Sequence, residues 1–200
     1  ILKFMDAFAG KDTLILTDPV MGDDGAVYPI YTEELRSRFC ELTRRSYVIT
    51  PNLTEALLLL YGKEKMEEIW KELQKASEAR RMEEIREIGC GLAREFSLLS
   101  VVITGVDHRE EGQPLKMGNL VLENGNSSWV FAEKSGGSYS GTGDLFASVL
   151  SAGLVKRYSM KTCAELAVDF ISASIRDAVE EGTDRNDGVC FEQHLGMLLP

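Results

Sequence analysis

A glycine-flanked aspartate stands where a helix should begin, in the stretch SYSGTGDLFASVLSAG of residues 138–153. Apolar residues after Asp144 recur at helical spacing, so the turn before it predicts a helix start. A helix N-terminus exposes unpaired N–H groups and a partial positive charge, which favour anions such as phosphate. Gly141 and Gly143 would let the backbone approach a ligand, and the Thr142 hydroxyl would cap the helix. The alternative is that Asp144 only complements the helix dipole.

Three short apolar runs rich in β-branched residues predict buried strands, and in each run a polar residue directly follows the apolar part. The runs are TLILTDPV (13–20), YVITPN (47–52) and VVITGV (101–106). Segments with helical spacing lie between them, and this alternation predicts a parallel sheet with helices on both faces. Ligands of such sheets bind outside the carboxyl ends of the strands. We therefore expect Asp18, Thr50 and Thr104 to converge on one site.

Two further motifs have plain local explanations when taken singly. DPVMGDDG, residues 18–25, contains Asp-Pro and Asp-Gly pairs, which form turns in many proteins. TPNLTEA, residues 50–56, opens a predicted helix, and Asn52 and Glu55 have the spacing of a capping box. Under that interpretation Glu55 does no more than satisfy a backbone donor.

The remainder of the chain predicts one domain over residues 1–200. Residues 107–132 alternate apolar and polar around Asn124-Gly125, which predicts a β-hairpin at an edge of the sheet. The charged stretch 63–96 predicts two amphipathic helices, and residues 161–180 predict another helix of the core.

The amino-acid composition argues against several classes of binding partner. The formal net charge is −10, which argues against a surface for nucleic acid or anionic lipid. No apolar run approaches the roughly 18 residues of a membrane span. The four cysteines lie far apart, without the spacing of a zinc site or a disulfide framework, as expected of a protein of the reducing cytoplasm.

Taken together and in this order, DPVMGDDG, ITPNLTEA, VVITG and SYSGTGDLFAS resemble the ribokinase-like superfamily, and within it the pyridoxal (pyridoxamine) kinases of vitamin B6 salvage. The resemblance covers residues 13–198. It implies an α/β fold, with a Rossmann-type, mostly parallel sheet flanked by helices and an antiparallel hairpin at one edge. Sugar kinases of the superfamily typically carry Gly-Ala-Gly-Asp in place of Gly-Thr-Gly-Asp, and hydroxymethylpyrimidine phosphate kinases typically end the motif in Cys.

The resemblance implies that ATP phosphorylates the 5′-hydroxyl of pyridoxal, pyridoxamine or pyridoxine, with Asp144 as general base. It implies an anion hole formed by Gly141, Thr142 and Gly143. Mg²⁺ would lie near Asp18 and Glu55, and a monovalent cation, K⁺ or Na⁺, near Asp18 and Thr50. The residues implied to contact or border ATP are Asn52, Glu55, Thr104, Gly105, Ser135, Gly136 and Gly137. Related kinases are often homodimers.

The chain begins without Met, at Ile1. The resemblance implies that N-terminal strands, a lid and most of the side chains that grip the pyridine ring would precede it, and that a protein truly starting at Ile1 has weak or no activity. Two alternatives stay open. One is a kinase for another small hydroxylated substrate, a hydroxymethylpyrimidine or a sugar. The other is a noncatalytic nucleotide-binding fragment.

Overall fold

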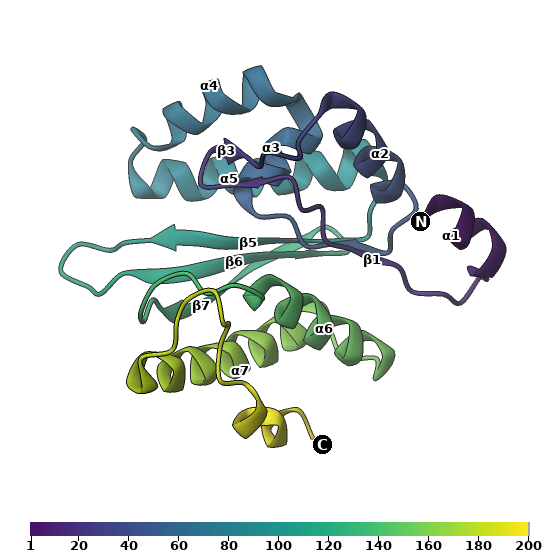
Figure 1. Cartoon of the computed structure of the whole chain (residues 1–200). Coiled ribbons are helices and arrows are strands. Elements are labelled where there is room, and N and C mark those ends of the chain that lie inside the picture. Colours follow the sequence, from purple (N-terminus) through teal and green to yellow (C-terminus); the bar gives the residue numbers. More distant parts are fainter. Residues whose placement is uncertain (200) are drawn as a thin grey trace.

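A five-stranded sheet runs through the middle of the protein (Figure 1). The computed structural model describes residues 1–199. In spatial order the strands are β1 (Leu16–Thr17), β4 (Val48–Ile49), β5 (Ser100–His108), β6 (Lys116–Glu123) and β7 (Asn126–Glu133). The pairs β1–β4 and β4–β5 are parallel, and β5–β6 and β6–β7 are antiparallel. The parallel strands and the edge hairpin are thus confirmed.

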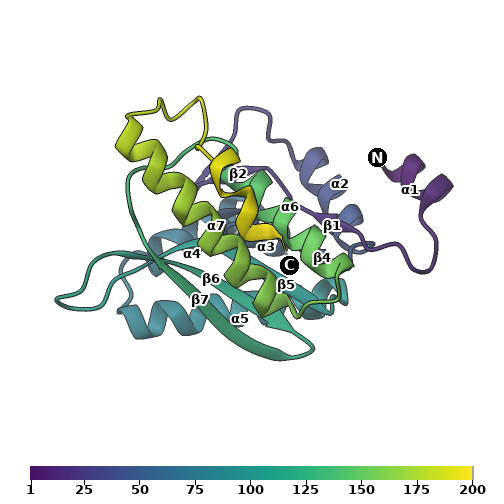
Figure 2. The same cartoon turned by 90° about the horizontal axis from the view of Figure 1, so that it is seen from below.

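Helices cover both faces of this sheet. On one face lie α2 (Glu33–Thr43), α3 (Leu53–Tyr61), α4 (Lys63–Leu73) and α5 (Glu78–Phe96). On the other lie α6 (Thr142–Val155) and α7 (Met160–Glu181). Figure 2 shows α6 and α7 crossing the sheet, with the 3₁₀ segment η1 (Glu192–Leu198) beside α7. The amphipathic helices expected in residues 63–96 and the core helix expected near 161–180 are confirmed.

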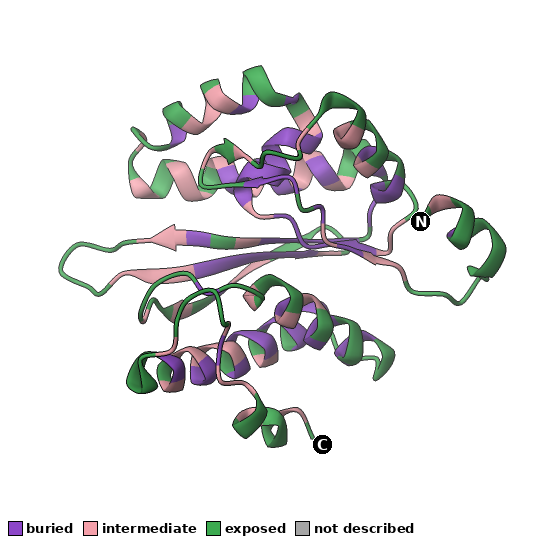
Figure 3. Cartoon of the chain, viewed as in Figure 1, coloured by how far each residue is buried: buried purple, intermediate pink, exposed green. Residues whose placement is uncertain are grey.

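Alternation along the strands divides the core into two layers. Val101 and Ile103 pack with α3 and α5, whereas Val102 between them packs with α6 and α7. Successive side chains of a strand point to opposite faces, so a sheet covered on both sides needs continuous apolar runs. Figure 3 shows the result, with the buried residues of the helices on the sides that face the sheet.

The two predicted parallel strands nearest the N-terminus are shorter than their apolar runs. Only Leu16–Thr17 of the first run and Val48–Ile49 of the second form ladder pairs. Pro19 lacks the N–H that a longer ladder would need, and Pro51 has the same effect on the next strand. Both strands therefore end after two paired residues, which places Asp18 and Thr50 directly beyond their carboxyl ends.

A second, two-stranded sheet lies outside the main one. It consists of β2 (Gly22–Asp23) and β3 (Ala26–Val27), which pair antiparallel and contact α3. The short helix α1 (Leu2–Phe8) projects from the body of the protein, with Phe4 and Phe8 exposed (Figure 1). Across residues 1–199, no helix has the length and apolar character that crossing a membrane requires.

Alanine substitutions at two glycines of α5 should have opposite effects on stability. A β-carbon on Gly89 would lie 2.4 Å from Leu122 Cδ1 in the core, whereas one on Gly91 would meet only ordinary contacts with Leu60, at 3.4 Å or more. We expect Gly89→Ala to lower the free energy of unfolding by about 1 kcal/mol or more through overpacking. Gly91→Ala should raise it by about 0.5–1 kcal/mol, because alanine favours helices. Urea unfolding measures both, and equal effects would contradict the packing shown here.

Candidate active site

The polar residues that end the parallel strands lie side by side. Thr50 donates a hydrogen bond from Oγ1 to Asp18 Oδ1 at 2.9 Å. Thr104 continues the same row, because its backbone N–H donates to Pro51 O at 2.9 Å and it forms a parallel bridge with Asn52. The predicted convergence of these strand ends is therefore present in the structure. It follows from the shared direction of β1, β4 and β5.

The glycine turn brings the start of α6 to this row. Gly141 precedes the helix with a φ of +82°, in the left-handed region, and Asp144 is the third helical residue and exposed. A β-carbon on Gly143 would lie 3.9 Å from Asp18 Oδ2. The exposed N-terminus of α6 thus faces the carboxylate that ends β1, although the two segments are far apart in the sequence.

The predicted capping role of Thr142 is wrong. Gly141 is the residue that precedes the first helical turn, and within residues 1–199 no side chain caps α6 there. Thr142 is itself the first helical residue, and its hydroxyl donates to Tyr139 O at 3.1 Å. This bond closes the preceding loop and leaves the first N–H groups of α6 without a side-chain acceptor from the turn. Such N–H groups are the donors that bind anions.

Two carboxylates share the space in front of α6. Burial raises the pKa of Asp18 above its usual range, the Thr50 hydroxyl opposes the shift, and the negative charge of Asp144 adds to it. The charge of Asp144 acts on Asp18 because the start of α6 lies next to that carboxylate, as the position of Gly143 shows. A cation between them would remove the repulsion.

Asn52 and Glu55 form the capping box that the sequence predicts. Asn52 Oδ1 accepts from the Glu55 backbone N–H at 2.9 Å, and Glu55 Oε2 accepts from that of Asn52, also at 2.9 Å. The same side chains reach further. Glu55 Oε1 accepts from Met21 N at 3.1 Å, and Asn52 Nδ2 donates to Gly22 O at 2.8 Å. Both side chains therefore hold the DPVMGDDG segment in place.

The β2–β3 hairpin that follows this segment is fixed from two sides. Thr54 Oγ1 accepts from Gly25 N at 2.8 Å, and Gly25 lies so close to the Trp70 indole that a β-carbon would come within 2.4 Å of Nε1. Tyr28, after the hairpin, stands 39% exposed. Burial raises its pKa, and the charges of Asp23, Glu55 and Asp18 raise it further. Sequence reasoning missed Thr54, Trp70 and Tyr28.

Thr104 and Gly105 form a bulge in β5, between Ile103 and Val106. Gly105 has a φ of +70°, and its N–H donates to Asn119 Oδ1 on β6 at 3.3 Å. Asn119 is another residue that sequence reasoning missed, because nothing in the run MGNLVLE marks it as a partner of a distant glycine.

The loop of Ser135, Gly136 and Gly137 lies against the C-terminal end of α7. A β-carbon on Gly136 would lie 2.5 Å from Val179 Cγ2, and Arg185 Nε donates to Ser138 O at 2.7 Å. The loop joins the site through the chain itself, since residues 138–141 lead directly into α6. Its contact with a nucleotide stays a prediction.

The residues present fit a Mg²⁺ ion that arrives on a phosphate ligand. Among residues 1–199, no group of three or more His, Cys, Asp or Glu side chains could hold a metal ion unaided. Both Glu55 oxygens accept backbone hydrogen bonds, whereas Asp18 Oδ2 faces the start of α6. Mg²⁺ commonly binds one or two carboxylates together with phosphate oxygens and waters. Asp18 suits that role, while metal contacts of Glu55 and Thr50 stay predictions.

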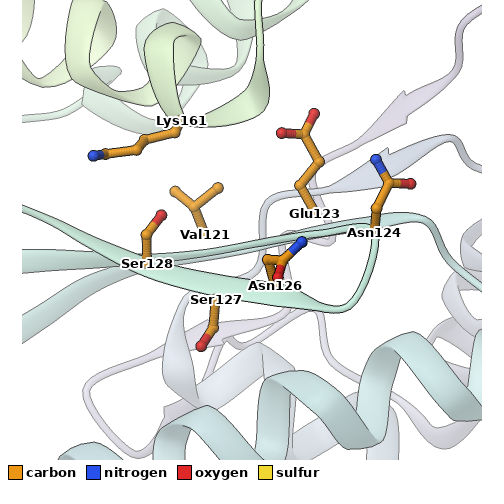
Figure 4. A pocket seen from close by; sticks show the side chains of 7 residues that line it. All are labelled: Val121, Glu123, Asn124, Asn126, Ser127, Ser128 and Lys161. Carbon is orange, nitrogen blue, oxygen red and sulfur yellow. The ribbon is translucent and has the colours of Figure 1, made fainter.

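A hollow of the surface lies elsewhere. It measures about 250 Å³ and is lined by Val121, Glu123, Asn124, Asn126, Ser127, Ser128 and Lys161 (Figure 4). Glu123 pairs with Ser100, the first residue of β5, so the hollow lies at the amino end of β5. Ligands of α/β sheets bind at the opposite, carboxyl ends. We therefore place the candidate site at the strand ends and α6.

Solved structures described as kinases have the same architecture as this chain. A candidate phosphomethylpyrimidine kinase from Bacteroides thetaiotaomicron matches with a TM-score of 0.83 and 27% identity over 99% of this chain and 64% of its own. A crystal form of such a protein with pyridoxal, from the same organism, matches with a TM-score of 0.81 and 29% identity over 99% of this chain and 65% of its own. Pyridoxal kinase from Lactobacillus plantarum matches with a TM-score of 0.74 and 25% identity over 94% of this chain and 61% of its own.

These matches define the fold class as that of the pyridoxal and phosphomethylpyrimidine kinases, which confirms the resemblance seen in the motifs. The family model for phosphomethylpyrimidine kinase matches residues 3–188. The chain therefore belongs to the phosphomethylpyrimidine kinase family. It spans less than two thirds of the length of these structural relatives.

The buried state of Glu55 predicts a pH dependence. Burial raises its pKa from about 4.5 to about 8, against the opposing effect of the N–H donors of Asn52 and Met21. Between these values the folded protein holds a proton that the unfolded chain has lost. Stability is therefore complete below pH 4.5 and falls by about 1.4 kcal/mol per pH unit as pH rises toward 8.

Glu55→Gln removes this titration and also one of the accepted hydrogen bonds. We expect the variant to be less stable than the unmodified protein at pH 5, and the deficit to shrink as pH rises to 8. Urea unfolding at several pH values measures this change. Glu68→Gln, at an exposed site in α4, is the matched control and should leave the pH profile unchanged. Parallel profiles for Glu55→Gln and the unmodified protein would show that Glu55 is ionised when folded.

Proposed function

We propose that the protein carrying this chain transfers the terminal phosphoryl group of ATP to the 5′-hydroxyl of a B6 vitamer: pyridoxal, pyridoxamine or pyridoxine. The observation that carries the proposal is the place of Asp144. It stands in the first turn of α6, directly after a left-handed glycine, and its charge acts on the strand-end carboxylate Asp18. A base, an anion-binding helix start and a carboxylate for a cation thus meet at one point.

Each part has a defined task in phosphoryl transfer. Asp144 takes the proton of the substrate hydroxyl while the oxygen of that hydroxyl bonds to the γ-phosphorus of ATP. The bond from the γ-phosphorus to the β,γ-bridging oxygen breaks at the same time, and ADP leaves. The N–H groups of the turn Gly141, Thr142 and Gly143 bind the phosphoryl oxygens, on which negative charge is concentrated. Mg²⁺ would neutralise phosphate charge when bound, and Asp18 would help to hold it there.

The B6 substrate is supported by two observations. The relative with 29% identity has a crystal form with pyridoxal. The motif of this chain ends in Asp144, whereas hydroxymethylpyrimidine phosphate kinases typically end it in Cys. The second candidate is a hydroxymethylpyrimidine, which the description of the matching family model favours. Both substrates present a hydroxymethyl group on an aromatic nitrogen heterocycle, so the same base and anion hole would serve either. The cytoplasmic location expected from the cysteines and the homodimer implied by the resemblance stay predictions.

A coupled assay of ADP release decides between the substrates. We would supply ATP and Mg²⁺ with pyridoxal, pyridoxamine or hydroxymethylpyrimidine, after measuring the intact mass of the protein. Turnover that depends on a B6 vitamer supports the proposal, and turnover with the pyrimidine alone would replace it by the second candidate. A protein of 22.2 kDa that binds ADP without turning over any substrate would support the noncatalytic alternative.

Asp144→Asn tests the general base in whichever protein shows turnover. The amide keeps the size of the side chain but cannot take a proton, so kcat should fall at least about 100-fold while the Kd for ADP stays within about threefold. Asp169→Asn, at an exposed position of α7, is the matched control and should retain full activity. Near-normal turnover by Asp144→Asn would remove Asp144 from the catalytic role and leave it as a residue that complements the helix dipole.

A further inference from the structure

Asn119 is a buried amide in an apolar strand. It is 5% exposed, and the next residues of β6, Leu120, Val121 and Leu122, belong to the two hydrophobic layers. An amide taken out of water without a partner costs free energy, so a buried amide is expected to hold a specific polar group. Here the carbonyl oxygen Oδ1 accepts a hydrogen bond from the backbone N–H of Gly105 at 3.3 Å.

The register of the sheet explains why Gly105 needs that partner. Ile103 pairs with Leu120 and Val106 pairs with Gly118, so Thr104 and Gly105 together stand opposite Asn119 alone. Such a bulge interrupts the ladder and leaves an N–H group without a strand partner. The Thr104 N–H donates a hydrogen bond to Pro51 O, beside the end of β4, and the Gly105 N–H donates one to the Asn119 side chain. Both donors are thereby satisfied.

The bulge opens onto free space at the edge where the site lies. A β-carbon on Gly105 would meet no described atom within 4 Å, so crowding is not the reason for a glycine here. The reason is the backbone of Gly105, which has a φ of +70°. Thr104 bridges Asn52, which is bonded to the hairpin beside Asp18. The bulge thus brings exposed backbone to the row of strand-end residues.

We infer that Asn119 is a positioning residue for this site: by holding the Gly105 N–H it fixes the bulge in the shape that lets a nucleotide lie against the open surface of Gly105, with its phosphates at the Thr104 hydroxyl. The inference rests on the proposed function, because it takes the ligand to be a nucleoside di- or triphosphate. Asn119 itself lies behind the bulge and acts through the backbone that it holds.

Asn119→Leu removes the acceptor and keeps the branching and the number of heavy atoms of the side chain. We expect the amide of Gly105, followed by NMR, to exchange with solvent at least about fivefold faster, as loss of one hydrogen bond implies. The Kd for ADP with Mg²⁺, measured by calorimetry, should rise at least about fivefold. Asn119→Asp keeps an acceptor oxygen in place and should preserve the slow exchange of Gly105.

Val121→Ala is the matched control. Val121 lies two residues further along β6, on the same face, and is 2% exposed. This variant should lower the melting temperature by several degrees through a cavity, yet leave both the Gly105 exchange and the Kd for ADP within about twofold. A purely structural role for Asn119 predicts instead that both variants change ADP binding in proportion to their loss of stability.

Two results would overturn the inference. One is unchanged exchange of the Gly105 amide in Asn119→Leu, which would show that the bond does not hold the bulge. The other is faster exchange with an unchanged Kd for ADP, which would show that the bulge does not serve the nucleotide. Failure of the unmodified protein to bind ADP would count against the proposed function, and the exchange measurement would still decide whether Asn119 holds the bulge.

Discussion

The buried carboxyl group of Glu55 joins two stretches of chain that are 34 residues apart, by accepting the N–H groups of Met21 and Asn52. Neither donor has an easy alternative, because Glu55 is 4% exposed and water is largely excluded from it. A buried donor left without an acceptor costs about 1–3 kcal/mol. The bond therefore holds the segment after β1 against the start of α3, and the positions of Asp18 and of the β2–β3 hairpin depend on it. The capping box is part of this arrangement and does not compete with a role in the site.

A phosphate ligand would meet an acidic protein here, and this constrains how it can be bound. The net charge of −10 supplies no long-range attraction for ATP, and Asp18 and Asp144 stand close to its expected place. Binding must then rest on short-range donors, which are the N–H groups at the start of α6, and on a cation that the two carboxylates favour. Under the proposed function, the same arrangement would keep an acidic side chain beside the reacting hydroxyl, where a general base is needed. The repulsion between Asp18 and Asp144 thus accords with the chemistry proposed for this site.

Local patterns predicted the parts of the molecule whose cause is local. Alternating apolar residues around Asn124-Gly125 predicted the edge hairpin, where both turn residues have positive φ, and the spacing of Asn52 and Glu55 predicted the capping box. The shared direction of parallel strands predicted that Asp18 and Thr50 would meet. Contacts between distant segments were beyond such reasoning. The Asn119–Gly105 bond depends on the register of β5 against β6, and the contact of Gly25 with Trp70 depends on how α4 packs. Thr142 was misassigned because its hydroxyl has a closer acceptor in the preceding loop, which spacing alone does not reveal.

The glycines of this fold separate into two physical kinds, and the distinction bears on the ligand. At Gly89 and Gly25, neighbouring side chains leave no room for a β-carbon, so glycine permits close packing. At Gly105 and Gly141 a β-carbon would meet no described atom within 4 Å, and a left-handed backbone is what requires glycine. The second kind shapes open surface, and what it presents is main chain. The main-chain N–H groups of the turn at Gly141 suit an anion better than an apolar ring, so under the proposed function this turn would lie on the phosphate side of the site. Under the proposed function, the aromatic ring of the substrate would then be recognised by other parts of the protein, and the proton transfer proposed for Asp144 would be the same for different heterocycles.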